Sequence, residues 1–212
     1  MRWAVLAVLA AGGCTPGGGT GTVAGTLFVT QCTVDTALGS PAAPIAFNLH
    51  PTYFVADPVL DLVHLHPMNH VSIRVQSEGN RIEEADGILL NVADTAEIAT
   101  LLGQPIPVGP ATNLRASLGL FRECPASSVQ MELDGTITFT RFGQTTAGAA
   151  VPEGFAIEFE DPITATFSFD VVDRRALTLG GTGSVPVTPE AGGHLDGGFD
   201  FIVRQGRAAQ AY

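Results

Sequence analysis

Ile163-Thr-Ala-Thr-Phe-Ser-Phe-Asp-Val171 decides the fold of this chain, because apolar and polar residues alternate along it without a break. In an extended chain successive side chains point to opposite faces, so the apolar residues of this stretch share one face and the polar residues share the other. The stretch therefore predicts a β-strand with one face in a core and one in water, which is typical of an antiparallel sheet.

The same alternation recurs along the chain and sets the fold class. It predicts strands at residues 70–76, 114–120, 155–160, 163–171 and 195–203. Further strands are expected at residues 25–33, 45–53, 87–93 and 129–142. Asp134-Gly135 could be a hairpin turn that splits the stretch 129–142, and Ala191-Gly-Gly193 has the composition of a turn. About nine or ten strands at this spacing predict an all-β fold, an antiparallel β-sandwich or a flattened barrel.

One short helix is expected between these strands. Asp94-Thr-Ala-Glu97 has the arrangement of a capping box, and Ile98, Leu101 and Leu102 supply an apolar stripe after it. Gly103 and Pro105 should end the helix. We expect it to be a connector between strands.

The composition predicts a folded domain and argues against an anionic partner. Of the 212 residues, 45% are hydrophobic and 15% charged, which is enough for one core, and residues 22–212 are expected to form a single domain. All ten basic residues are Arg, and the 21 acidic residues give a net charge of −11. This charge argues against a nucleic-acid partner, because phosphate recognition needs clustered Lys and Arg.

The first residues resemble an export signal. Arg2 supplies a positive charge and residues 3–11 an apolar run, which is too short for a bilayer core that needs roughly 20 apolar residues. Residues 1–13 are therefore expected to be a cleaved signal peptide. Residues 14–21 are rich in glycine and are expected to be a flexible tether.

Leu9-Ala-Ala-Gly-Gly-Cys14 resembles the lipobox of bacterial lipoproteins, with Ala11 where the family usually has leucine. The resemblance implies that Cys14 receives a diacylglycerol and becomes the N-terminus. It also implies a lipid-anchored protein of the cell envelope, and Thr15 after the cysteine favours the outer membrane. The body is similar in style to uncharacterised envelope lipoproteins of GC-rich Gram-negative bacteria. The alternative is ordinary signal-peptide cleavage, which would release a periplasmic or secreted protein.

Acylation of Cys14 would leave Cys32 and Cys124 as a pair. In an exported protein two such cysteines favour a disulfide. The bond would close a loop of about 92 residues and contribute roughly 4–5 kcal/mol on the chain-entropy model. The alternative is two separate buried thiols.

Three histidines lie close together in His64-Leu-His66-Pro-Met-Asn-His70. On an extended segment His64 and His66 point to the same side, so their imidazoles could share zinc or copper, with His70 or Asp61 completing the set. The alternative is a polar loop, because Pro67 interrupts the strand pattern.

Catalytic motifs do not stand out. There is no Gly-x-Ser-x-Gly and no calcium-loop spacing, and the glycine pattern at residues 19–25 lacks the preceding strand and following helix of a dinucleotide site. The twelve phenylalanines could line a cavity for an apolar ligand, but core packing explains them more simply. We therefore expect a binding or structural module with an unknown protein or small-ligand partner, no cofactor and no enzymatic activity. The alternative is a metal- or small-ligand-binding envelope protein that uses the three histidines.

Overall fold

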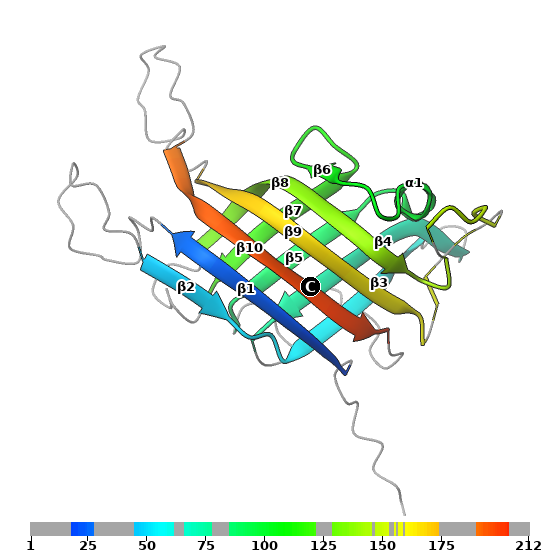
Figure 1. Ribbon diagram of the computed structural model, residues 1–212, viewed down its shortest axis with the longest axis horizontal. Coiled ribbons are helices and arrows are strands. Elements are labelled where there is room, and N and C mark those ends of the chain that lie inside the picture. The colour runs from blue at the N-terminus through cyan, green and yellow to red at the C-terminus, as the bar shows by residue number, and fades with distance from the viewer. Residues whose placement is uncertain are drawn as a thin grey trace, which may run out of the picture.

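In the residues that it describes, the computed structural model shows one antiparallel β-sheet of ten strands with one short helix (Figure 1). It describes residues 18–27, 45–61, 66–77, 85–121, 129–145, 147–152, 155, 157–158, 160–173 and 190–203. All structural statements below concern these residues. The predicted all-β, antiparallel fold is confirmed.

The elements follow one another along the chain in the order of their labels. They are β1 (Gly19–Leu27), β2 (Ile45–Leu49), β3 (Tyr53–Asp61), β4 (His66–Gln76), β5 (Gly87–Val92), α1 (Thr95–Thr100), β6 (Ile106–Val108), β7 (Leu114–Leu120), β8 (Val129–Phe142), β9 (Pro162–Asp173) and β10 (Glu190–Ile202).

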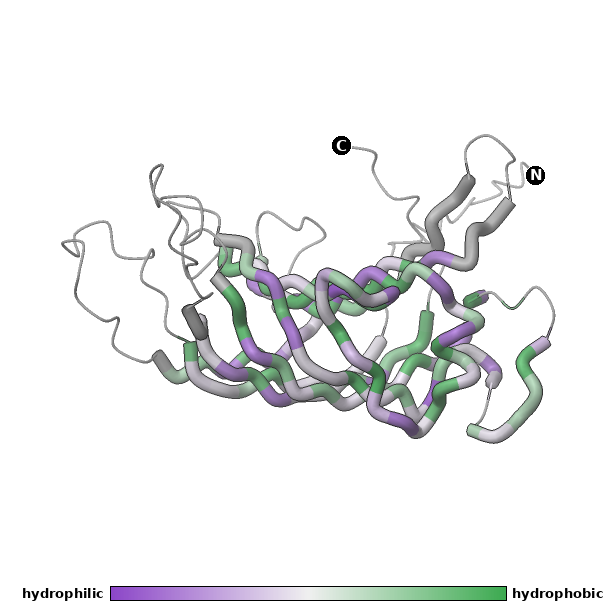
Figure 2. The backbone as a smooth tube through the Cα atoms, turned by 90° about the horizontal axis from the view of Figure 1, so that it is seen from above, coloured by the Kyte–Doolittle hydropathy of each residue, from purple (hydrophilic) through white to green (hydrophobic). Residues whose placement is uncertain are grey.

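The sheet curls so that its two halves face each other. The strand order is β2-β1-β10-β9-β8-β7-β5-β4-β3, and β6 pairs with β8 beside this path. Strands β1, β9 and β10 cross over β3, β4 and β5 in Figure 1, and the view from above in Figure 2 shows the two layers. Strands β2 and β3 end the sheet on opposite sides, yet only residues 50–52 separate them, so the two ends approach each other at this corner.

The core lies between the two layers. On β9 the alternation at residues 163–171 places the apolar side chains inside, where Ile163, Phe169 and Val171 are fully buried. Phenylalanine rings pack against one another there, for example Phe139 on Phe142 with centroids 5.1 Å apart and Phe167 on Phe169 with centroids 4.7 Å apart. These described phenylalanines fill the core, as the simpler of the two interpretations predicted.

The predicted turn at Asp134-Gly135 is wrong. Strand β8 runs through it, and Gly135 pairs with Phe169 on β9. Gly135 has a φ of +152°, and a Cβ there would lie 2.2 Å from the carbonyl oxygen of Ser168. The glycine therefore serves a close approach between two strands, which sequence alone does not distinguish from a turn.

The glycine-rich stretch at the end of the predicted tether also belongs to a strand. Gly19 and Gly21 pair with Phe201 and Phe199. A Cβ at Gly19 would lie 2.4 Å from the Cβ of Phe201, so close packing on β10 explains this glycine. The first strand was expected at 25–33 and lies at Gly19–Leu27, with residues 28–33 outside the described part of the chain.

The predicted turn at Ala191-Gly-Gly193 is also wrong. Strand β10 passes through these residues, and a bulge there shifts its register against β9. The bulge takes up one extra residue without ending the strand.

The strand predicted at 155–160 is wrong. Phe155 and Ile157 are buried as expected, but the described residues of this stretch lie outside strands. The backbone of Glu160 has a φ of +68°, and the N–H of Glu158 donates to the Asp161 carboxylate at 2.7 Å. Local turn interactions have replaced strand pairing here.

Helix α1 confirms the predicted connector. The Asp94 carboxylate accepts from the backbone N–H groups of Ala96 and Glu97 at 2.9 and 3.2 Å, as an N-cap requires. The Glu97 side chain instead accepts from the amide of Asn113 at 2.6 Å. Within the described residues, no helix is long and apolar enough to cross a membrane.

Candidate functional site

Most of the residues predicted to be functional lie outside the described part of the chain. These are Cys14, Cys32, Cys124 and His64. The acylation site and the disulfide therefore stay predictions.

The predicted metal site is not complete in the described residues. His66 pairs with Asp61 at the end of β3, and His70 lies four residues further along β4, half-buried. Four residues of extended strand span about 13 Å, which is too far for two positions to share one ion without a distortion of the strand. Among the described residues, no group of three His, Cys, Asp or Glu side chains is arranged so that it could hold a metal ion. The metal hypothesis depends on His64 and stays untested.

A polar cluster lies on the outer face of β9 and β10. His194 pairs with Asp170 across the two strands, and Asp196 pairs with Ser168 beside them. These four residues, His194, Asp170, Asp196 and Ser168, are called the His194 cluster below. Their neighbours in sequence, such as Phe169, point to the core. Figure 2 shows this alternation of hydrophilic and hydrophobic residues along the strands.

The imidazole of His194 is held by three side chains. Its Nδ1 lies 2.8 Å from Oδ1 of Asp170, and its Nε2 lies 3.2 Å from Oγ of Ser168 and 3.4 Å from Oδ1 of Asp196. The cluster is open to water, since the side chains of His194, Asp170 and Asp196 are 50%, 73% and 69% exposed. Water therefore screens their charges strongly.

Two carboxylates stabilise the protonated imidazole. The hydrogen bond to Asp170 raises the pKa of His194 above its ordinary value of 6.5, and the charge of Asp196 raises this pKa further. The partial loss of hydration at His194 lowers the pKa and so acts in the opposite direction. As an imidazolium, His194 can donate from both ring nitrogens.

The order Ser168, His194, Asp170 matches the contacts of a serine-hydrolase triad, in which the imidazole joins a hydroxyl to a carboxylate. The surroundings do not match. Both β9 and β10 are paired on both sides, so their backbone N–H groups are engaged in the sheet and are not aimed at an oxyanion. A raised pKa also makes His194 a poorer acceptor for the serine proton at neutral pH. The geometry therefore favours a charge cluster over a nucleophilic site.

Sequence reasoning missed the His194 cluster. Ser168 and Asp170 lie two positions apart in the most regular strand of the chain, but His194 comes 24 residues after Asp170. Only the register of β9 against β10 brings them together. A prediction that these two stretches pair as antiparallel neighbours would have placed His194 opposite Asp170.

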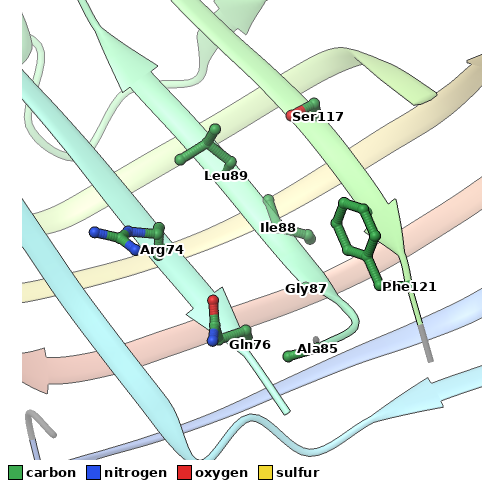
Figure 3. Close-up of a pocket in the computed structure, with 9 residues that line it drawn as sticks. Arg74, Gln76, Ala85, Gly87, Ile88, Leu89, Ser117 and Phe121 are labelled. Carbon is green, nitrogen blue, oxygen red and sulfur yellow. The ribbon is translucent and has the colours of Figure 1, made fainter. Parts of the chain in front are cut away.

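A shallow cavity lies on the outer face of the other layer (Figure 3). Gly87 and Gly119 pair across β5 and β7 and leave a depression, which Gln76 and Phe121 border. Its volume is about 30 Å³, enough for a water molecule and too small for an organic ligand. This cavity does not support a small-molecule site by itself.

The comparisons with known proteins add no relative: no family model, no curated protein and no solved structure matches the chain. Any function must therefore be inferred from the chemistry of the leader and of the described surface.

Proposed function

We propose that this protein is a lipid-anchored module of the cell envelope, placed at the outer membrane, that binds a partner through its exterior and catalyses no reaction. The observation that carries the proposal is the position of Cys14. The lipobox-like stretch ends there, and strand β1 begins five residues later at Gly19. A folded body that follows soon after the cysteine suits an acyl anchor, because the lipid then holds the body at the membrane.

The surface that we propose for binding is the outer face of β9 and β10. It carries the exposed side chains of Asp170 and Asp196, in a chain with a net charge of −11. Like charges repel and opposite charges steer partners together, so a cationic protein surface suits this face better than a nucleic acid or an anionic membrane.

The test of the anchor is the Cys14→Ala variant expressed from the full chain. Cys14→Ala should move the protein from the membrane fraction to the soluble fraction, and Thr15→Ala should leave it in the membrane. The intact mass of the Thr15→Ala protein should show a chain starting at Cys14 with added acyl mass. Unchanged fractionation of Cys14→Ala would contradict the anchor and leave the secreted or periplasmic alternative.

The test of the binding face uses a decalysine peptide and calorimetry at low and high salt. Asp170→Asn combined with Asp196→Asn should weaken binding several-fold at low salt, and high salt should weaken binding to the unchanged protein. Glu97→Gln is the matched control, because it removes a carboxylate on α1, away from β9 and β10. Equal binding by all three proteins would contradict the proposed face.

The alternative function is metal or small-ligand binding at His64, His66 and His70. Zinc added to the purified protein would then raise its unfolding temperature, and His66→Ala would remove the effect. His50→Ala is the control, since His50 lies in the link between β2 and β3. A zinc effect that survives His66→Ala would assign the metal to other residues.

A further inference from the structure

The short connection between Cys14 and β1 limits where the body can lie. A chain covers at most about 3.6 Å per residue, so the five steps from Cys14 to Gly19 span no more than about 18 Å. Gly19 pairs with Phe201, which places the start of β1 beside the end of β10. If Cys14 carries the proposed lipid, this end of the sheet must stay near the membrane surface. The inference below rests on that proposed anchor.

The same end of the sheet exposes an apolar side chain. Ile202 is 46% exposed, and among the described residues no other large hydrophobic side chain is exposed. Its neighbours Phe201 and Val203 are buried, so Ile202 points away from the core. The N–H of Ile202 donates to the carbonyl of Gly18 at 3.4 Å, which places Ile202 directly beside the chain that leads to Cys14.

Acidic residues lie near this apolar side chain. The N–H of Glu160 donates to the carbonyl of Val203 at 2.8 Å, and both Glu160 and Asp200 are exposed. A negatively charged lipid surface would repel these carboxylates, whereas a zwitterionic surface would not. This end of the sheet therefore offers an apolar side chain to a membrane, and its negative charge favours zwitterionic over anionic lipids.

We infer that the end of the sheet formed by Gly18, Gly19 and residues 200–203 lies on the lipid surface, with Ile202 in the headgroup region. The lipid anchor brings this end to the membrane, and Ile202 orients the body on it. The outer face of β9 and β10 then extends away from the anchored end, because β10 runs from Ile202 back toward His194. The partner of this end of the sheet is therefore a zwitterionic bilayer.

Tryptophan fluorescence can test this contact, because the one tryptophan of the chain is Trp3 in the leader. In the mature protein the Ile202→Trp substitution would therefore supply the sole tryptophan. Thr26→Trp is the matched control, since Thr26 is exposed near the other end of β1, about 20 Å from Thr20. Both acylated proteins are reconstituted into phosphatidylcholine vesicles, with and without brominated lipid.

The Ile202→Trp protein should shift its emission to the blue by several nanometres on vesicles and lose at least half of its intensity with brominated lipid. The Thr26→Trp protein should change little. Thr20→Trp provides a second probe that keeps Ile202, because Thr20 is also exposed and pairs with Asp200 across β1 and β10.

Two failures can be told apart. If the probes at positions 20 and 202 behave like the probe at position 26 while the protein still floats with the vesicles, the inference is overturned and the anchor stands. Absence of flotation and of acyl mass would overturn the anchor instead.

The charge of the lipid provides a second test of the inference. Replacing a third of the phosphatidylcholine by phosphatidylglycerol should reduce the quenching of the Ile202→Trp protein, and Glu160→Gln should restore part of it. Equal or stronger quenching on the anionic vesicles would contradict the role given to Glu160 and Asp200.

Discussion

The ring of Phe54 stacks on the ring of Phe201, with centroids 5.6 Å apart and planes inclined by 25°. Phe54 belongs to β3, which ends the sheet on one side, and Phe201 belongs to β10 near the other end of the strand order. A Cβ at Gly21 would lie 3.2 Å from the Phe54 ring, so this glycine leaves room for the ring. The contact joins the two layers of the curled sheet through side chains, because β3 and β10 are not neighbours in the strand order.

Removing either ring should destabilise the fold strongly. Both side chains are about 1% exposed, and Phe54→Ala or Phe201→Ala should each lower the free energy of unfolding by about 3–5 kcal/mol. The double variant should show a coupling of about 0.5–1.5 kcal/mol in urea unfolding. Phe155→Ala is the control, because Phe155 packs on Phe142, and its effect should add to that of Phe54→Ala. Additive effects of Phe54→Ala and Phe201→Ala would show that the two rings are not coupled.

Gly135→Ala should be costly although it adds one methyl group. The new Cβ would meet the Ser168 carbonyl at 2.2 Å, and the positive φ disfavours any side chain. We expect a loss of about 2–4 kcal/mol of unfolding free energy from the clash and the strain together. Gly148→Ala is the control: its φ is +80° but a Cβ there meets nothing within 4 Å, so only the backbone strain applies. Equal losses at the two glycines would rule out the close approach of β8 and β9 as the cause.

Gly135 also shows where sequence patterns reach their limit. Alternation predicted β7 and β9 because each of these strands has one buried face. It also predicted the burial of Phe155 and Ile157, but their backbone lies outside the sheet, next to a turn. Alternation reports which side chains are buried. It does not report whether a glycine bends the chain or admits a neighbouring strand, because that depends on the pairing partner.

The His194 cluster was missed for the same reason. Each of its side chains occupies an ordinary polar position on a strand. Only the register of β9 against β10 brings these side chains into contact. The N-cap Asp94, in contrast, was predicted correctly, because its bonds to Ala96 and Glu97 involve neighbours in sequence. Local interactions can be predicted from one sequence, whereas contacts across a sheet require the topology.

The pKa of His194 should depend on Asp170. In an NMR titration the pKa of His194 should lie above 6.5 in the unchanged protein and should fall in Asp170→Asn, which removes the largest cause of the increase. Asp200→Asn is the matched control, because Asp200 lies on the same strand face but accepts from Thr164 at 3.1 Å. A pKa unaffected by Asp170→Asn would contradict the hydrogen bond at 2.8 Å.

The sign of the linked stability change follows from this increase. A raised pKa in the folded protein means that protonated His194 stabilises the fold fully below its unfolded pKa, near 6.5, and that this contribution is lost as the pH rises through the folded pKa. Because the cluster is exposed, we expect no more than about 0.2–1 kcal/mol. His194→Gln should remove this part of the pH dependence of unfolding.

The pairing of Cys32 with Cys124 remains a prediction that mass spectrometry can test. Both cysteines lie outside the described residues. Under denaturing conditions without reductant, the purified mature protein should resist thiol alkylation, and reduction should add the mass of two hydrogens. Cys32→Ala should leave Cys124 open to alkylation. Two alkylated cysteines in the unreduced protein would favour the separate thiols.

Ser168 should not act as a nucleophile, despite its 3.2 Å contact with Nε2 of His194. The imidazole is drawn toward the protonated form by two carboxylates, and Asp196 competes with Ser168 for the same nitrogen. The surrounding backbone donors are engaged in the sheet, so an oxyanion formed at this face would lack stabilisation. A fluorophosphonate probe should therefore leave the mass of the protein unchanged at pH 7 and at pH 9, under conditions that label a serine protease completely. An adduct at both pH values that disappears in Ser168→Ala would overturn this prediction, and with it the assignment of the His194 cluster to binding.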